Sequence, residues 1–128
     1  MSENRELEGL VAIVTGAARN IGRAIALDLA RGGAAVVVNA VASADAAAET
    51  ARLIESQGGK AIVHLADVTK PEDAEGLMQA AEKAFGGIDI LVNNAAIRRE
   101  TPFAEMDYAR WREVMAVILD GAYICAHA

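Results

Sequence analysis

The sequence predicts an α/β fold in which a parallel sheet is covered by helices on both faces. Four apolar runs of strand length alternate with longer segments whose apolar residues recur at helical spacing. The connections between them are short, and most contain glycine or another turn residue. Because such alternation produces parallel strands joined by right-handed crossovers, we expect a doubly wound sheet. The 128 residues are enough for one hydrophobic core, and we expect a single domain over residues 1–128.

The first predicted strand covers residues 10–15 and leads through a glycine-containing turn into a helix over residues 20–31. Within that helix Ile21, Ile25 and Leu29 lie four positions apart, so they share one face. A pair of glycines follows and ends the helix.

The second strand, residues 34–39, is apolar on both faces, as a central parallel strand is. A helix that Ser43 can cap follows it and extends to residue 57. The third strand covers residues 61–66. The helix after it begins with Thr69 as the capping hydroxyl and an early proline, and it extends to Phe85.

The fourth strand is predicted at residues 88–93, and the last helix begins near Met106 or Asp107. Its expected buried face carries Trp111, Met115, Ile118, Ala122 and Cys125. The four strands then take the spatial order 3-2-1-4 of a Rossmann-like sheet, which binds ligands at the carboxyl ends of strands 1 and 4.

The turn between the first strand and the first helix is the strongest candidate for a binding site. A helix N-terminus offers unpaired backbone N–H groups and a partial positive charge, which suit a pyrophosphate. Gly16 permits a left-handed backbone, Gly22 lets the helix pack close to the sheet, and Asn20 suits a left-handed conformation or an N-cap. The residues assigned to the site here are Gly16, Ala18, Arg19, Asn20, Ile21 and Gly22. The alternative is an ordinary strand-to-helix turn.

Polar residues also follow the other strands, at the same predicted edge of the sheet. Asp67 is placed to offer a carboxylate to an adenine amino group. The residues assigned here are Asn39, Asp67, Val68, Asn94, Ala95 and Ala96. Each of the polar ones alone is compatible with a turn residue that caps the next segment. Their joint occurrence around one crevice favours a dinucleotide site.

Three of these segments resemble the motifs of the short-chain dehydrogenase/reductase family, in the order that the family has them. They are residues 15–22 (Thr-Gly-Ala-Ala-Arg-Asn-Ile-Gly), 67–69 (Asp-Val-Thr) and 93–96 (Asn-Asn-Ala-Ala). Essentially the whole chain is similar to the N-terminal half of such an enzyme. The resemblance implies NAD(P)-dependent hydride transfer between a nicotinamide and a carbonyl or alcohol substrate, usually in homo-oligomers such as dimers or tetramers.

The same resemblance implies a catalytic Ser and a Tyr-x-x-x-Lys motif, which the family has beyond the helix on which this chain stops. Arg112 stands four residues after Tyr108, and His127 stands four residues after Tyr123. We therefore assign no catalytic residue. We expect a chain truncated before the fifth strand, with the catalytic groups beyond it and no activity from these residues alone.

The resemblance also places Ile118 where the family usually has the Asn that steadies a proton-relay water. Either Ile118 packs in the core and the relay is rearranged, or turnover is impaired. Asp120, two residues on, is expected on a different side of the helix. A non-catalytic nucleotide-binding or assembly module, such as a pseudoenzyme or truncated product, is therefore the alternative function. A further alternative is that the isolated half, with its last strand an unpaired edge, is no functional unit.

Cofactor choice in such sheets usually depends on an acid at the end of the second strand, which binds the ribose 2′-hydroxyl. Ala40 stands there, eighteen residues after Gly22, so nothing selects NAD(H). Arg19 can pair with a 2′-phosphate, unless it is only a solvated loop residue. The sequence therefore favours NADP(H) over NAD(H).

Composition excludes several other classes of protein. The net charge is −6, with no basic run longer than Arg98-Arg99, which argues against nucleic-acid binding. No stretch is apolar enough to predict a membrane span, and the polar start is no secretory signal. The single Cys125 fits a reducing compartment, so we expect a cytoplasmic protein. We assign no metal-binding residue. Arg98, Arg99 and Glu100 either line the rim of a substrate pocket or form a solvated loop.

Overall fold

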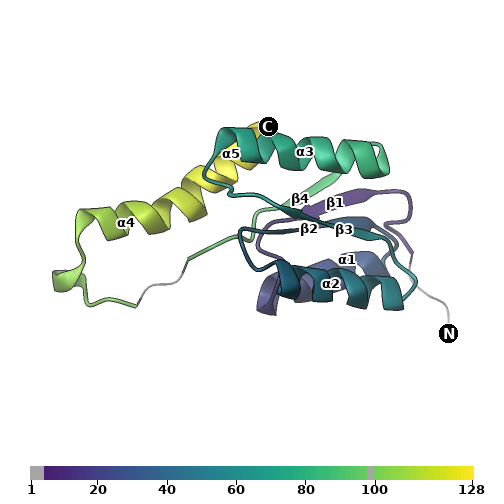
Figure 1. Cartoon of the computed structure of the whole chain (residues 1–128), viewed down its shortest axis with the longest axis horizontal. Helices are drawn as coiled ribbons and strands as arrows, with labels where there is room; N and C mark the ends of the chain where they lie inside the picture. The colour runs from purple at the N-terminus through teal and green to yellow at the C-terminus, as the bar shows by residue number, and fades with distance from the viewer. Residues whose placement is uncertain (1–4, 98–99) are drawn as a thin grey trace.

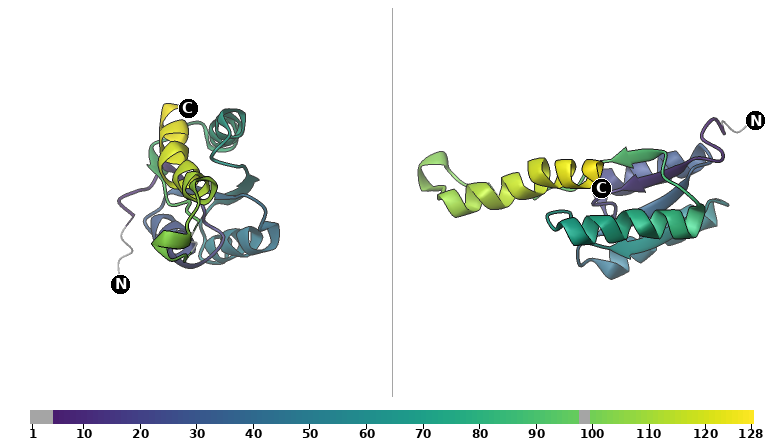
Figure 2. Two further views of the ribbon diagram at one scale, coloured as in Figure 1. Left: turned by 90° about the vertical axis from the view of Figure 1, so that its left-hand side faces the viewer. Right: turned by 90° about the horizontal axis from the view of Figure 1, so that it is seen from above.

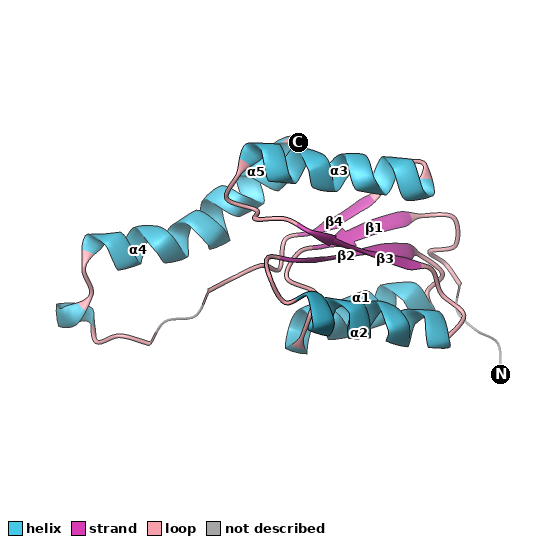
Figure 3. Ribbon diagram, in the orientation of Figure 1, coloured by secondary structure: helices cyan, strands magenta, loops and turns pink. Residues whose placement is uncertain are grey.

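The computed structural model describes residues 5–97 and 100–128, and it places a parallel sheet between two layers of helices (Figure 1; Figure 3). The four strands are β1 (Val11–Val14), β2 (Ala35–Ala40), β3 (Ala61–Leu65) and β4 (Ile90–Val92). The helices are α1 (Asn20–Arg31), α2 (Ala44–Ser56), α3 (Pro71–Phe85), α4 (Tyr108–Met115) and α5 (Gly121–His127). A short 3-10 turn, η1 (Phe103–Glu105), precedes α4, and a π-helical turn, η2 (Ala116–Asp120), joins α4 to α5. The predicted strand order is confirmed, since the sheet runs β3-β2-β1-β4 with all neighbours parallel.

The period-two alternation of β1 divides the core between the two faces of the sheet. Ala12 and Val14 belong to the core beneath α1 and α2, whereas Val11 and Ile13 belong to the core beneath α3 and α5. All four side chains are buried, as expected for a strand that is apolar on both faces. The register Val14↔Val38 on one side and Val14↔Val92 on the other brings the carboxyl ends of three strands together.

Helix α1 has the predicted bounds, but its N-cap differs from the prediction. Asn20 takes a left-handed conformation, with φ of 53°, which confirms its suitability for that geometry. Arg19 occupies the N-cap position and makes no side-chain capping bond, so of the two possibilities for Asn20 the N-cap is not the one found.

Neither of two predicted capping hydroxyls makes a capping bond. Ser43 stands at the N-cap of α2 without a side-chain capping bond, and its hydroxyl accepts a bond from Arg19 instead. Lys70, not Thr69, is the N-cap of α3, because the Thr69 hydroxyl donates to the carboxylate of Asp67. The Ser43 hydroxyl bonds to a residue distant in sequence and the Thr69 hydroxyl to a residue of its own loop, and both lie between a strand end and the next helix.

The last helical segment extends past the end of the sheet and is interrupted by η2. Figure 2 shows α4 projecting beyond the strands, while α5 lies beside α3. The predicted shared face is wrong, because a π-helical turn shifts the side chains after it relative to those before it. Cys125 is buried, whereas Trp111 is 48% and Ile118 is 47% exposed.

Strand β4 is the edge strand next to β1, as expected. Ile90, Leu91 and Val92 are only half-buried, in contrast to the fully buried β1 beside them. Nothing in the described part of the chain forms a helix long and apolar enough to cross a membrane.

Candidate functional site

The turn between β1 and α1 is held from inside the sheet by Thr15 and Asn94. The hydroxyl of Thr15, which is 1% exposed, accepts bonds from the backbone N–H groups of Asn94 and Ala95, both at 3.0 Å. The Asn94 side-chain amide donates to the carbonyls of Thr15 at 3.2 Å and Gly16 at 3.1 Å. The ends of β1 and β4 are therefore locked together at the start of the turn.

Gly16 and Gly22 are required by this close packing. Gly16 has a φ of +63°, the left-handed conformation that the sequence predicted. A Cβ on Gly22 would overlap the Gly16 carbonyl oxygen and lie 2.6 Å from Asn94 Nδ2. The glycine therefore lets the helix approach the turn and Asn94, which corrects the expectation that it serves packing against the sheet.

The outer part of the turn is held by α1 and α2. Thr50, fully buried on α2, places its hydroxyl 3.0 Å from the Ala17 carbonyl and 3.2 Å from the Ala18 carbonyl. Arg23 donates to the Ala18 carbonyl at 2.7 Å. Every carbonyl of residues 15–18 thus has a side-chain hydrogen-bond partner.

With these carbonyls turned into the protein, the N–H groups of the following residues remain available. Within the described residues, the backbone N–H groups of residues 18–22 donate to no protein acceptor. They belong to Ala18, Arg19, Asn20, Ile21 and Gly22, which are all among the predicted site residues. Unpaired N–H groups at the start of a helix form a site for an anion such as a phosphate.

Asn39, at the end of β2, is 1% exposed and supports the turn rather than reaching outward. Its side-chain oxygen accepts from the Gly16 N–H at 3.3 Å, and its backbone carbonyl accepts from the Ala17 N–H at 2.8 Å. Its amide nitrogen donates to the carbonyls of His64 and Ala66, both at 3.2 Å. Asn39 therefore ties the turn to β2 and to the end of β3.

A hollow of about 400 Å³ lies at this carboxyl edge of the sheet. It is bounded by the turn, by the ends of β2 and β3, by the loop after β4 and by α4 with η2. Its lining residues are Gly16, Asn39, Val41, Asp67, Val68, Thr69, Ala95, Ala96, Ile97, Glu113, Ala116 and Val117. Six predicted site residues are among them: Gly16, Asn39, Asp67, Val68, Ala95 and Ala96. Asn94 does not line the hollow, but it holds the turn that does.

Asp67 is fixed at the wall of this hollow by its own loop. The hydroxyl and the backbone N–H of Thr69 donate to Asp67 Oδ1 at 2.6 and 2.9 Å. The bond from the Thr69 hydroxyl, and after it the bond from the Thr69 backbone N–H, lower the pKa of Asp67 below its ordinary value. The carboxylate is therefore ionised at neutral pH. Among the described residues no group donates to Oδ2, which remains able to accept from an amino group.

Arg19 lies beside the loop that follows β2. Its guanidinium donates to the Ser43 hydroxyl at 3.2 Å, and its side chain is exposed. Ala40 is buried, and it offers no carboxylate at the position where an acid would bind a ribose hydroxyl. This corner of the site therefore carries a cation and a hydroxyl but no acid at that position.

Ile118 is exposed on η2 and does not pack in the core, so that expectation is wrong. It borders a small cleft together with Thr15, Asn93 and Gly121. Asp120, on the same π-helical turn, accepts from Arg112 at 3.2 Å. Its carboxylate is therefore paired outside this cleft.

The tyrosines show none of the pairing that the family motif would give. Tyr108 is 75% exposed, and Tyr123 stacks on His127 with 5.5 Å between ring centroids. Glu100 is exposed, whereas Arg98 and Arg99 lie outside the described residues. The part of the chain that the structure describes contains no group of three acidic, histidine or cysteine side chains able to hold a metal ion.

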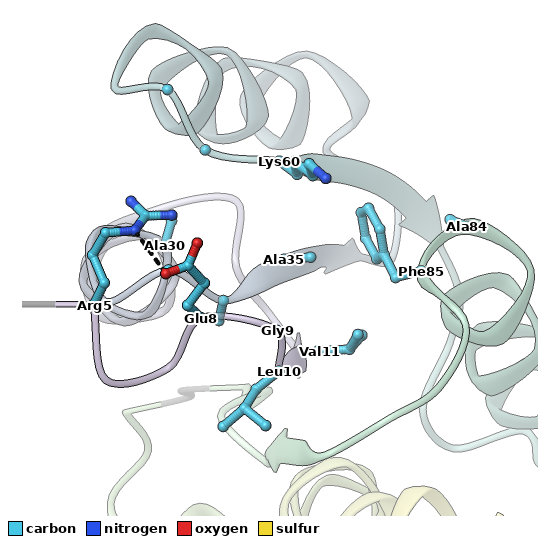
Figure 4. A pocket seen from close by; sticks show the side chains of 14 residues that line it. Arg5, Glu8, Gly9, Leu10, Val11, Ala30, Ala35, Lys60, Ala84 and Phe85 are labelled. Atoms are coloured by element: carbon cyan, nitrogen blue, oxygen red, sulfur yellow. Dashed lines mark ion pairs between the residues drawn. The ribbon is translucent and has the colours of Figure 1, made fainter.

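A second hollow, of about 520 Å³, lies at the opposite edge of the sheet, at the amino ends of the strands (Figure 4). Arg5 and Glu8 form an ion pair there at 3.4 Å, and Lys60 and Phe85 stand on the far wall. Glycines and alanines form much of the rest of its wall.

Thr15, Arg23 and Thr50 are the residues of this arrangement that the sequence did not assign to the site. Thr15 directly precedes Gly16, and its position at a strand end is the signal that points to it. Thr50 stands on the apolar stripe of α2 among Ala47, Ala51 and Ile54, where a hydroxyl needs a partner. Arg23 gives no signal in the sequence that separates it from a solvated helix residue.

Comparison with known proteins identifies the family. The family model of short chain dehydrogenases matches residues 10–128. An uncharacterized oxidoreductase of Methylorubrum extorquens is 42% identical over 96% of this chain, and a 3-oxoacyl-[acyl-carrier-protein] reductase of Synechocystis sp. is 40% identical over 95%. These alignments cover 50% and 49% of the two relatives, so the chain spans about half their length. The crystal structure of a short chain dehydrogenase from Mycobacterium avium superposes with a TM-score of 0.89 and 38% identity, covering 94% of this chain and 44% of that one. The chain therefore belongs to the short-chain dehydrogenase family of oxidoreductases.

Proposed function

We propose that this chain holds a nicotinamide dinucleotide for an enzyme that transfers hydride to or from a carbonyl or alcohol carbon. One observation carries the proposal: the carbonyls of residues 15–18 are tied back by side chains, while the N–H groups of residues 18–22 stay free. Family membership implies the same cofactor class. Residues 1–128 act in this proposal as a single dinucleotide-binding domain.

The residues present fit such a cofactor. The start of α1 suits the pyrophosphate, because its free N–H groups and helix dipole favour an anion. The missing side chain at Gly22 keeps the helix close to the turn, so the donors converge. The ionised Asp67 and the buried Val68 suit the adenine, with Asp67 Oδ2 as acceptor for its amino group.

The bound dinucleotide would supply the hydride or take it up. This chain's own part is to bind and orient it: Thr15 and Asn94 hold the loop after β4, where Ala95 and Ala96 form a wall of the hollow. Neither a tyrosine nor a lysine lines that hollow. We therefore place the acid–base groups outside these residues.

We propose NADP(H) rather than NAD(H) as the preferred cofactor. Arg19 and Ser43 stand together beside the end of β2, where a 2′-phosphate would lie, and Ala40 offers no acid to repel it. A hydrogen bond to a charged group contributes about 1.5–3 kcal/mol, so a bond from Arg19 to the 2′-phosphate would raise the affinity for NADP(H) at least tenfold.

The substrate class, assembly and location follow by analogy. A ketone substrate agrees with the Synechocystis relative, whose name is that of a 3-oxoacyl reductase. Exposed Trp111 and Tyr123 on α4 and α5 support assembly into a homo-oligomer. The free, buried Cys125 agrees with a reducing compartment such as the cytoplasm.

Titration of the complete encoded protein with NADPH and NADH tests the proposal. We expect both to bind, NADPH the more tightly, and NADPH to be oxidised when ketones are added. If neither dinucleotide binds at millimolar concentration, the proposed function is wrong.

A second candidate function is dinucleotide binding without turnover, which the exposed Ile118 favours. An aliphatic side chain cannot hold a water, so a relay that depends on the family's Asn is interrupted there. The variant Ile118→Asn in the complete protein separates the two functions. If only the variant reduces ketones while both proteins bind NADPH equally, the natural protein is a binding module.

A further inference from the structure

We infer that Thr50 and Arg23 form a positioning pair that aims the backbone N–H groups of the β1–α1 turn at the pyrophosphate. This inference rests on the proposed dinucleotide binding and adds to it two residues that make no contact with the ligand. They act from the opposite side of the turn, through the carbonyls of Ala17 and Ala18.

The peptide plane couples each carbonyl to the N–H group that follows it. The carbonyl of one residue and the N–H of the next point in opposite directions, because the peptide unit is planar and trans. Holding the Ala17 and Ala18 carbonyls toward α2 therefore turns the N–H groups of Ala18 and Arg19 the other way. Those two N–H groups are the first of the free donors at the start of α1.

The Thr50 hydroxyl has one proton and several carbonyls within reach. A threonine in a helix commonly donates to the carbonyl four residues earlier, which here is Ala46 at 3.3 Å. The Ala17 carbonyl is nearer, at 3.0 Å, although it belongs to a different element thirty-three residues away in sequence. The shorter distance favours donation to the turn.

Arg23 makes that choice possible. Its Nη2 donates to the Ala46 carbonyl at 3.0 Å, so this carbonyl does not depend on Thr50. Its Nε donates to the Thr50 hydroxyl oxygen at 2.9 Å, which fixes the hydroxyl as an acceptor from Arg23 and a donor toward a carbonyl. The same Nη2 also donates to the Ala18 carbonyl at 2.7 Å.

The burial of Thr50 makes its bonds important for the turn. Thr50 is 0% exposed, so water cannot replace its hydroxyl if it is removed. A buried carbonyl left without a donor reorients toward any other donor or toward solvent, because the unpaired state is costly. Removing the Thr50 hydroxyl therefore lets the peptide units of the turn reorient, while the apolar contacts of α2 remain.

The test compares Thr50→Val with Thr50→Ser in the complete encoded protein. Valine keeps the shape of threonine without its hydroxyl, and serine keeps the hydroxyl without the methyl group. We expect Thr50→Val to raise the Kd for NADPH about tenfold, equivalent to about 1.4 kcal/mol, and Thr50→Ser to stay within about twofold of the wild type. Ser56→Ala is the matched control, since its hydroxyl also donates to a carbonyl of α2, that of Leu53, far from the turn.

Adenosine serves as the second probe, because it lacks the pyrophosphate and addresses only the Asp67 side of the site. A general loss of structure weakens both ligands, whereas a loss of positioning weakens NADPH alone. Adenosine binding measured by saturation-transfer NMR should therefore be unchanged in Thr50→Val. Equal weakening of both ligands, or unchanged NADPH binding, overturns the inference and leaves the proposed function standing. If the wild-type protein binds no dinucleotide, the proposed function fails and the inference fails with it.

Discussion

Gly22→Ala is the substitution whose outcome follows most directly from the packing of the turn. A Cβ at this position would overlap the carbonyl oxygen of Gly16, lie 2.6 Å from the side-chain nitrogen of Asn94, and lie 2.9 Å from the Cα of Ala17. Two of these three neighbours are backbone atoms, which cannot rotate away. Either the turn or the helix must therefore shift.

Two opposing contributions set the size of the effect. Replacing glycine by alanine inside a helix stabilises it by about 0.5–1 kcal/mol. Overpacking in a closely packed region costs about 1–3 kcal/mol, and backbone contacts place this site at the upper end of that range. We expect a net loss of about 2 kcal/mol in the free energy of unfolding. We also expect the Kd for NADPH to rise at least tenfold, because the shifted turn loses the convergence of its N–H donors.

Gly76→Ala in α3 is the matched control. A Cβ there meets only His64 Nε2, at 3.8 Å, which is an ordinary contact. This variant should gain about 0.5–1 kcal/mol and leave NADPH binding unchanged. Urea unfolding and fluorescence titration measure both quantities. The reasoning is refuted if Gly22→Ala is stabilised like Gly76→Ala and binds NADPH as tightly as the wild type.

Four further predictions follow from single side chains. Thr15→Val leaves the N–H of Ala95 without its acceptor and should lower the free energy of unfolding, measured in urea, by about 1–3 kcal/mol, whereas Thr15→Ser should stay close to the wild type and an equal loss in both variants would contradict this role. Arg19→Gln should weaken NADPH about tenfold and NADH hardly at all in paired titrations, and equal losses would contradict the 2′-phosphate assignment. The pKa of Asp67 is lowered in the folded state, so its contribution to stability is present above the unfolded Asp pKa of about 4 and is lost as pH falls below it. The stability difference between wild type and Asp67→Asn should therefore shrink below about pH 4, and a difference that is constant down to pH 2 speaks against the bond network. Burial raises the pKa of the Cys125 thiol, so Ellman's reagent at pH 8 should react with it only after unfolding, and rapid labelling of the native protein would show otherwise.

The order of the elements was predictable because the local signals in this chain agree with one another. Helix α1 has the predicted ends, since its apolar residues keep a strict spacing and glycines follow it. The strand order follows from the right-handed crossover rule once four strand–helix units are recognised.

The strand and helix ends were less predictable, because they depend on particular hydrogen-bond partners and on a local change of helix type. Strand β4 begins two residues later than predicted, where the N–H of Asp89 donates to the Val11 carbonyl and the Asp89 carboxylate accepts from the Val11 N–H. Thr69 resembles a helix cap in the sequence, but its hydroxyl donates to the carboxylate of Asp67. The π-helical turn at residues 116–120, which carries the exposed Ile118, has no local signal in the sequence.

The candidate site divides in the same way. The residues that face the hollow or carry free N–H groups were predictable, because glycines and strand-end polar residues mark them in the sequence. The supporting groups Arg23 and Thr50 were not, since their role depends on how α1 and α2 lie together. Asn39 was assigned to the site, but its buried side chain makes it a support of the turn.

A crystal structure of the complete encoded protein with NADPH tests whether the β1–α1 turn binds the pyrophosphate of a nicotinamide dinucleotide. We expect phosphate oxygens within hydrogen-bond distance of the N–H groups of residues 18–22, with the adenine in the hollow beside Asp67. A dinucleotide seated instead in the hollow at the amino ends of the strands, or phosphates that leave those N–H groups without a partner, would contradict this expectation.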